Sequence, residues 1–469
     1  MKPNFLKNVI YMSSGEAYLI FISLISLPIY IYKLGLEGYA IYGLVSSFFM
    51  IVSNFDIPFF LGFLKGQKDR ETQEQSFATV YLFVHIFNIF LLFIQVPLIL
   101  LLVKYAYQRP DYYILYIIGL ALFMFLRFNK ILICFYRSIG KEKVLQRAFV
   151  PSRLLGFLFT ILFLFVFELG VISIFLGLLS YQLMTYIMLM KSLKRYILFK
   201  YSFSIVLFKK IFRKYSAVEL LLKWFIVFSY EGIIFFCSLF VGPSLLGVIT
   251  LFIHVLEKLG MLLNSLFIYT CRFFQENIGR LKRTFAFSKS LIFISTVFHL
   301  LCLVSLFLLL LAASSYSLLQ FDYTIAFIIL ISGKTLFISE FIFSSYLFVS
   351  KANRLMLLHL IIDPLYVFLS LYLIIHFGIL AFSIIYLLRQ ALFFILFVGH
   401  YAKDISLGLD ARTFKFYIVA SLLTVSSWLI LLFPEYLLFS ILALVLISVV
   451  FLFLHNKQII GALKEISSI

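Results

Sequence analysis

Residues 9–63 read VIYMSSGEAYLIFISLISLPIYIYKLGLEGYAIYGLVSSFFMIVSNFDIPFFLGF. Two apolar stretches, 9–32 and 39–63, are each long enough for a helix that crosses a bilayer, which needs roughly 20 residues. A short segment with Gly35 and Gly38 separates them. This pattern predicts a hairpin of two transmembrane helices, and similar stretches recur along the whole chain.

The composition is that of a polytopic membrane protein. Of 469 residues, 64% are hydrophobic and 13% are charged, and the mean hydropathy is +1.11. A soluble domain is nearer half apolar and a quarter charged. We predict an all-α membrane bundle of about 14 transmembrane helices, with spans at 9–32, 39–63, 77–103, 112–136, 148–167, 171–190, 217–241, 246–271, 289–312, 323–350, 357–376, 379–399, 415–433 and 436–454.

Lys and Arg residues in the loops indicate how the chain is oriented. The loops that share a side with both termini carry 29 of them, whereas the opposite loops carry only Lys33, Lys104 and Arg109. Cytoplasmic loops are enriched in Lys and Arg, so both termini are predicted to be cytoplasmic. The net charge of +19 is therefore an orientation signal, and we expect no nucleic-acid partner.

The predicted outward loops are short, which argues against an enzyme. Membrane glycosyltransferases and polysaccharide polymerases generally need a sizeable outward loop to shape a catalytic pocket. The four cysteines show no CxxC spacing, so they indicate neither a disulfide framework nor a metal site. We expect no catalytic residue, no metal and no cofactor.

The longest inward connection, 191–216, divides the chain. Its apolar residues recur at helical spacing and its basic residues occupy the other face, which predicts an amphipathic helix on the anionic cytoplasmic leaflet. Glycine-containing turns follow both the first and the seventh span, which favours parallel six-span repeats. The predicted regions are an N-lobe (1–190), this linker (191–216), a C-lobe (217–414), and two further spans with a cytoplasmic tail (415–469).

Apart from Lys289 and Lys415 at the first positions of their spans, fourteen Asp, Glu, Lys and Arg residues lie inside the predicted spans, seven basic and seven acidic. Each is unfavourable in lipid and needs a partner or a water-filled cavity. Arg127 and Lys130 lie one helical turn apart and have the same sign, so they cannot neutralise each other, which favours a cavity-lining role. An anionic headgroup that travels between two lobes would need cations at several depths. The basic candidates for substrate binding are therefore Arg127, Lys130, Lys258, Lys334 and Arg389.

Four acidic residues are candidates for coupling to an ion gradient: Glu16, Asp56, Glu231 and Asp363. A carboxylate in a low-dielectric cavity can take up a proton or a cation. For each residue a plain salt bridge is the alternative interpretation. His85, His299 and His359 are interpreted as ordinary interior residues.

Two stretches resemble a known family. The first is Tyr32-Lys33-Leu34-Gly35-Leu36-Glu37-Gly38-Tyr39-Ala40-Ile41-Tyr42, and the second is Phe135-Tyr136-Arg137-Ser138-Ile139-Gly140-Lys141-Glu142-Lys143. They are similar to the first hairpin and to the inward loop after the fourth span of bacterial polysaccharide flippases, which translocate O-antigen and capsule repeat units. These flippases belong to the multidrug/oligosaccharidyl-lipid/polysaccharide exporter superfamily. A count of 14 spans also resembles the lipid II flippase branch, but the first span here lacks the arginines of that branch.

The resemblance implies a two-lobed bundle in the bacterial inner membrane. Its substrate would be an undecaprenyl-pyrophosphate-linked oligosaccharide, moved by alternating access through a cationic central cavity. Membrane lipids, a polysaccharide polymerase and other export machinery are the implied partners. Two alternatives remain, a cation-coupled multidrug exporter of the same superfamily and a polysaccharide polymerase.

Overall fold

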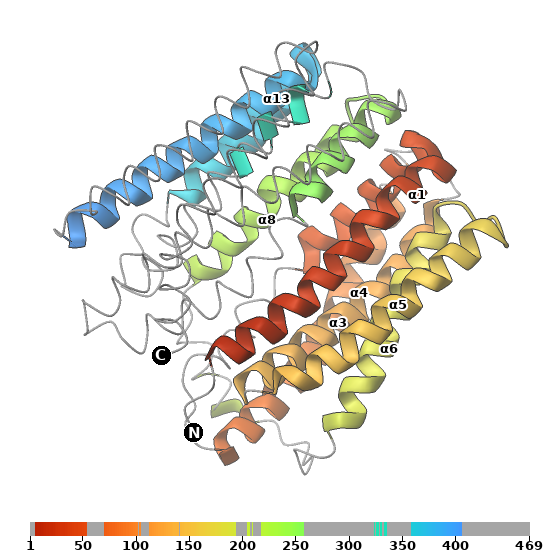
Figure 1. Ribbon diagram of the computed structural model, residues 1–469, viewed down its shortest axis with the longest axis vertical. Coiled ribbons are helices and arrows are strands. Elements are labelled where there is room, and N and C mark those ends of the chain that lie inside the picture. Colours follow the sequence, from red (N-terminus) through yellow and green to blue (C-terminus); the bar gives the residue numbers. More distant parts are fainter. Residues whose placement is uncertain are drawn as a thin grey trace, which may run out of the picture. The chain divides into compact units, whose positions relative to one another are not determined.

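The computed structural model describes residues 5–53, 70–101, 103–104, 112–139, 141–193, 204–206, 209, 217–257 and 358–405, together with several positions between 323 and 334. Within these residues all regular secondary structure is helical. The helices, labelled in Figure 1 where there is room, are α1 (Phe5–Ser53), α3 (Arg70–Leu101), α4 (Tyr112–Ser138), α5 (Glu142–Phe165), α6 (Ile172–Leu193), α8 (Ala217–Cys237), an unlabelled helix Pro243–Glu257, and α13 (His359–Ile405).

Six of the described helices are long and apolar enough to cross a membrane. They overlap the predicted first hairpin, the third to sixth spans, and the eleventh and twelfth spans. Residues 54–63 of the second predicted span lie outside the described residues. The predicted all-α, multi-pass membrane bundle is therefore confirmed. The predicted spans 289–312, 415–433 and 436–454 lie outside the described residues.

The long helices α1 and α13 are each two helices that meet at a glycine. Gly35 in α1 has φ 68° and Gly378 in α13 has φ 75°. This left-handed region is readily available only to glycine. Both glycines fall in outward loops predicted from the sequence, so the first and second spans, and the eleventh and twelfth, are separated where expected.

Contacts among α3 to α6 show that neighbouring spans alternate in direction. Phe77 packs against Phe135 and Phe87 lies against Arg127, so α3 and α4 run antiparallel. Asn129 bonds to Gln182 and Tyr136 to Leu189, both with an offset of 53 residues, so α4 and α6 run parallel. This is the alternation on which the predicted orientation of the loops depends.

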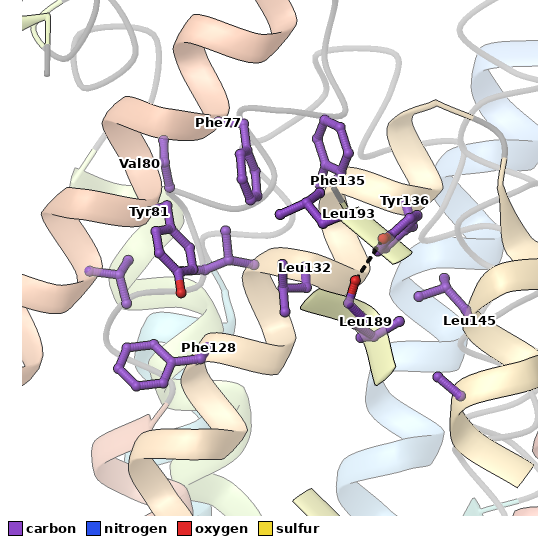
Figure 2. Packing of buried hydrophobic residues seen from close by; sticks show 13 residues of the cluster. Phe77, Val80, Tyr81, Phe128, Leu132, Phe135, Tyr136, Leu145, Leu189 and Leu193 are labelled. Atoms are coloured by element: carbon purple, nitrogen blue, oxygen red, sulfur yellow. Dashed lines mark hydrogen bonds between the residues drawn. The ribbon is translucent and has the colours of Figure 1, made fainter. Parts of the chain in front are cut away.

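A hydrophobic cluster with several aromatic rings joins α3, α4, α5 and α6 (Figure 2). The ring centroids of Phe77 and Phe135 are 4.6 Å apart. The Tyr136 hydroxyl donates a hydrogen bond of 2.8 Å to the carbonyl oxygen of Leu189. This bond gives the Tyr136 hydroxyl a hydrogen-bond partner in a region of the bilayer that contains no water.

Helices α5 and α6 approach each other closely at small residues. The Thr160 hydroxyl donates to the carbonyl oxygen of Gly156 at 2.9 Å. A Cβ atom added to Gly177 would meet the Thr160 side chain and the Gly156 carbonyl oxygen. Small residues of this kind let two helix backbones approach in a membrane protein.

The chain divides into two compact units, residues 10–253 and residues 1–9 with 254–469. Helices α3 to α6 and α8 belong to the first unit, and α13 belongs to the second. The lobe boundaries at 190 and 217, and the amphipathic character of 191–216, stay predictions.

We predict that Gly177→Leu destabilises the protein by about 1–3 kcal/mol, because the larger side chain overpacks the α5–α6 crossing. Thermal unfolding of the purified protein in detergent micelles measures the effect. Gly242→Ala is the matched control, since a Cβ atom there would meet nothing within 4 Å. Equal melting temperatures for the two variants would contradict the close approach.

Candidate substrate and coupling sites

Arg127 is enclosed inside the first unit. Its side chain on α4 is fully buried, and its guanidinium carbon lies 5.3 Å from the ring centroid of Phe87 and 5.0 Å from that of Phe123. Aromatic rings attract a cation through their electron-rich faces, most strongly where water is excluded. The two rings therefore hold the guanidinium in a fixed place within an apolar helix bundle.

Lys130 lies one turn further along α4 and is half-buried. The two cations thus share one side of α4, as the sequence predicted. Together they place two positive charges on one membrane-spanning helix.

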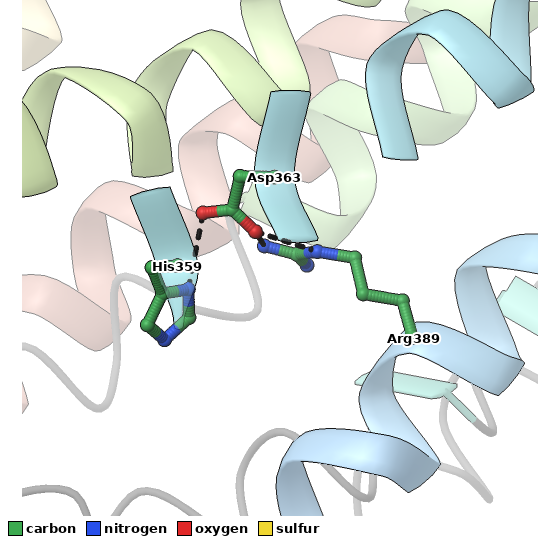
Figure 3. A network of polar contacts seen from close by, with 3 residues as sticks. All are labelled: His359, Asp363 and Arg389. Carbon is green, nitrogen blue, oxygen red and sulfur yellow. Dashed lines mark hydrogen bonds and ion pairs between the residues drawn. The ribbon is translucent and has the colours of Figure 1, made fainter. Parts of the chain in front are cut away.

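Arg389 lies in the second unit, in the part of α13 that follows Gly378, where it pairs with Asp363 (Figure 3). Its Nε and Nη2 atoms donate to Asp363 Oδ1 at 3.0 Å and 2.6 Å. The Arg389 side chain is 4% exposed and that of Asp363 is 0% exposed. The plain salt bridge, named as the alternative for Asp363, is thus formed in this structure.

His359 completes this cluster, although the sequence identified it only as an interior residue. Its Nδ1 atom lies 3.0 Å from Asp363 Oδ2. This is a hydrogen-bonding distance, and an ionised Asp363 carboxylate accepts the hydrogen bond when His359 carries its proton on Nδ1. The signal that would have found this contact is the i,i+4 spacing of the two residues on one helix face.

Aromatic side chains surround the ion pair. The guanidinium carbon of Arg389 lies 4.9 Å from the ring centroid of Tyr366 and 5.3 Å from that of Phe393. The His359 ring stacks on Phe393 with centroids 4.0 Å apart. Arg389 therefore has the same aromatic enclosure as Arg127, with a carboxylate and a histidine added.

Lys334 is buried in the same unit. The neighbouring Gly333 lies against the ring of Tyr386, and Tyr386 lies 6.4 Å from Tyr366 between ring centroids. Through these tyrosines, the helical segment that carries Lys334 packs against the part of α13 that carries Arg389. Two predicted substrate-binding residues thus lie on elements in direct contact.

The other predicted site residues are placed in part or not at all. Glu231 is buried on α8. Glu16 belongs to α1, but its side chain is outside the described residues, as are Asp56 and Lys258. Among the residues that the structure describes, no group of three or more His, Cys, Asp or Glu side chains is arranged to hold a metal ion.

The glycine-containing turns after the first and seventh spans lie against each other in the first unit. A Cβ atom on Gly247 would meet the carbonyl oxygen of Leu36, and one on Gly43 would meet the Thr250 side chain. The Ser244 hydroxyl donates to Glu37 at 3.5 Å. The second half of α1 and the helix that begins at Pro243 therefore meet through small residues at the end predicted to face outward.

The sequence matches no protein-family model and no curated protein. The structure is similar to an inward-facing multidrug resistance MATE family transporter of the MOP superfamily, with a TM-score of 0.64 and 14% identity over 85% of this chain and 96% of that one. An outward-facing transporter of the same description gives a TM-score of 0.62 and 17% identity over 87% and 98%.

A third similar structure is a MOP superfamily transporter from Pyrococcus furiosus. It gives a TM-score of 0.61 and 16% identity over 87% of this chain and 98% of that chain. Its description states that reverse polarity of the binding pocket suggests a different function. At these identities the likeness concerns the fold, so the chain has the fold of the MATE transporters.

We predict that Asp363→Leu or Arg389→Met alone destabilises the protein by about 3–5 kcal/mol, because each leaves a buried charge without its counterion. The double variant is expected to recover most of that stability, as measured by thermal unfolding in micelles in a double-mutant cycle. The exposed pair Lys33–Glu168, 3.1 Å apart, is the control, and breaking it should cost under about 1 kcal/mol. Additive losses at Asp363 and Arg389 would show that the two residues are not coupled.

Proposed function

We propose that the protein is a flippase that moves an undecaprenyl-pyrophosphate-linked oligosaccharide across the inner membrane by alternating access through a cationic cavity. The observation that carries this proposal is Arg127, fully buried between Phe87 and Phe123 on a membrane-spanning helix. Lys130 lies one turn away. Such cations are expensive in lipid and are typical of a pathway for an anion.

The chemistry of the substrate explains the choice of residue types. A pyrophosphate presents several acceptor oxygens, and an arginine can donate to two of them with its planar fork. Lysine adds a compact charge with rotatable donors. Because Phe87 and Phe123 hold the Arg127 guanidinium in place, less conformational freedom is lost when the phosphate binds.

Arg389 and Asp363 have a second role in this proposal. Their ion pair has to open before Arg389 presents its whole donor fork to a phosphate, and Asp363 then becomes available to a proton or a cation. This exchange would couple substrate binding to an ion gradient. Glu231, which is buried on α8, is a further coupling candidate in the other unit.

Alternating access needs helix contacts that separate during the cycle. Gly43 and Gly247 lie at a close contact between α1 and the helix Pro243–Glu257. We propose that these helices part at the outward end during the cycle, with both termini in the cytoplasm and with polymerase and export machinery as partners.

We predict that the double variant Arg127→Gln, Lys130→Gln lowers translocation at least about 100-fold, since each charge-assisted hydrogen bond contributes roughly 1.5–3 kcal/mol. The measurement is export of the lipid-linked glycan in cells, with membrane insertion checked by fractionation. Lys143→Gln, Arg147→Gln is the matched control, because it removes two exposed cations one turn apart on α5. Normal export by the first variant would refute a cationic binding site at Arg127.

The second candidate function is a cation-coupled multidrug exporter. The observation in its favour is the likeness to multidrug resistance MATE transporters. An organic cation would be repelled by Arg127 and Lys130, and would instead require the acidic residues. Proton-driven accumulation of ethidium by vesicles that contain the purified protein, with no translocation of a lipid-linked glycan, would decide for this function.

A further inference from the structure

Two buried amides on α3 have unused hydrogen-bonding capacity. Asn88 and Gln95 are 3% and 2% exposed. Neither the nitrogen nor the oxygen of either amide has a hydrogen-bond partner among the residues that the structure describes. The two residues are seven positions apart, so they lie on one face of the helix, about two turns apart.

The antiparallel register of α3 and α4 places these amides relative to Arg127. Phe87, the neighbour of Asn88, lies against the Arg127 guanidinium. Further outward, Ile99 of α3 and Leu115 of α4 share one apolar cluster. Asn88 is therefore level with Arg127, and Gln95 lies about 10 Å further toward the predicted outward end.

Packing alone does not account for these two residues. The opposite face of α3 is apolar and exposed, with Phe90 at 55% and Phe93 at 75%, as expected for a surface in contact with lipid. Buried polar groups without partners are destabilising, and an apolar residue of similar shape would pack better. Asn88 is level with the buried Arg127, and Gln95 lies about two turns further along the same face of α3. This placement indicates that the two amides form hydrogen bonds when a ligand is bound.

We infer that Asn88 and Gln95 form a subsite for the hydroxyl groups of a neutral sugar, next to a phosphate contact at Arg127. This inference rests on the proposed flippase function. An amide offers both donors and acceptors, as a sugar hydroxyl does, whereas a phosphate oxygen only accepts. The apolar lipid tail can neither donate nor accept a hydrogen bond, so it does not account for the two amides.

The test compares two substrates in vesicles of phosphatidylethanolamine and phosphatidylglycerol that contain the purified protein. One probe is undecaprenyl pyrophosphate with a neutral tetrasaccharide, detected outside with an impermeant lectin. The other is undecaprenyl pyrophosphate without sugar, detected with an impermeant phosphatase. Asn88→Leu, Gln95→Met is expected to slow the first probe about tenfold and to leave the second at the wild-type rate.

Thermal unfolding separates this role from a structural one. The double variant should melt at the wild-type temperature or higher, because it removes unsatisfied polar groups. Asn129→Leu is the matched control, since Asn129 donates to the carbonyl oxygen and to Oε1 of Gln182 at 2.8 Å and 2.7 Å. It should melt at a lower temperature.

Three results would overturn the sugar subsite alone: unchanged transport of both probes by the variant, an equal loss for both probes, or a lower melting temperature of the variant. If the wild-type protein moves neither probe, the flippase proposal fails together with the subsite. Slower transport of the sugar-bearing probe alone, at unchanged or higher melting temperature, supports the subsite.

Discussion

Charge inside a hydrocarbon layer has to be enclosed by protein, and this requirement governs the described helices. On α3 the apolar side chains of Phe90 and Phe93 are exposed on the surface of the protein, whereas the side-chain amides of Asn88 and Gln95 are buried. The usual arrangement of a soluble helix is thereby inverted. Because lipid tails form no hydrogen bonds, each polar side chain needs a hydrogen-bond partner inside the helix bundle or in a ligand that binds there.

The two buried arginines meet this requirement in different ways. Arg389 has a carboxylate, a histidine and two aromatic rings around it, an arrangement in which charges balance. Arg127 lies between two aromatic rings. The Asp363 carboxylate has to release Arg389 before that arginine can bind an anion. Arg389 is therefore assigned to coupling in the proposed function.

Much of the fold was predictable because its signals are local in the sequence. The third to sixth spans appear as α3 to α6, and the first and sixth outward hairpins bend at Gly35 and Gly378. The side of α4 shared by Arg127 and Lys130 also follows from helical periodicity. The partners of these residues were not predictable, because Phe87 and Arg127 are 40 positions apart and meet only through the antiparallel register of two helices.

By itself the sequence determined the fold class, the alternating direction of the spans and the presence of charge in the membrane, since hydropathy and loop charge are properties of short segments. The tertiary structure alone decided which charges are neutralised. It paired Asp363 with Arg389 and brought His359 to the same carboxylate. It also left Asn88 and Gln95 buried without partners among the described residues. The pairing of buried polar groups depends on the distances between helices. The periodicity of the sequence indicates only which face of a helix each side chain occupies.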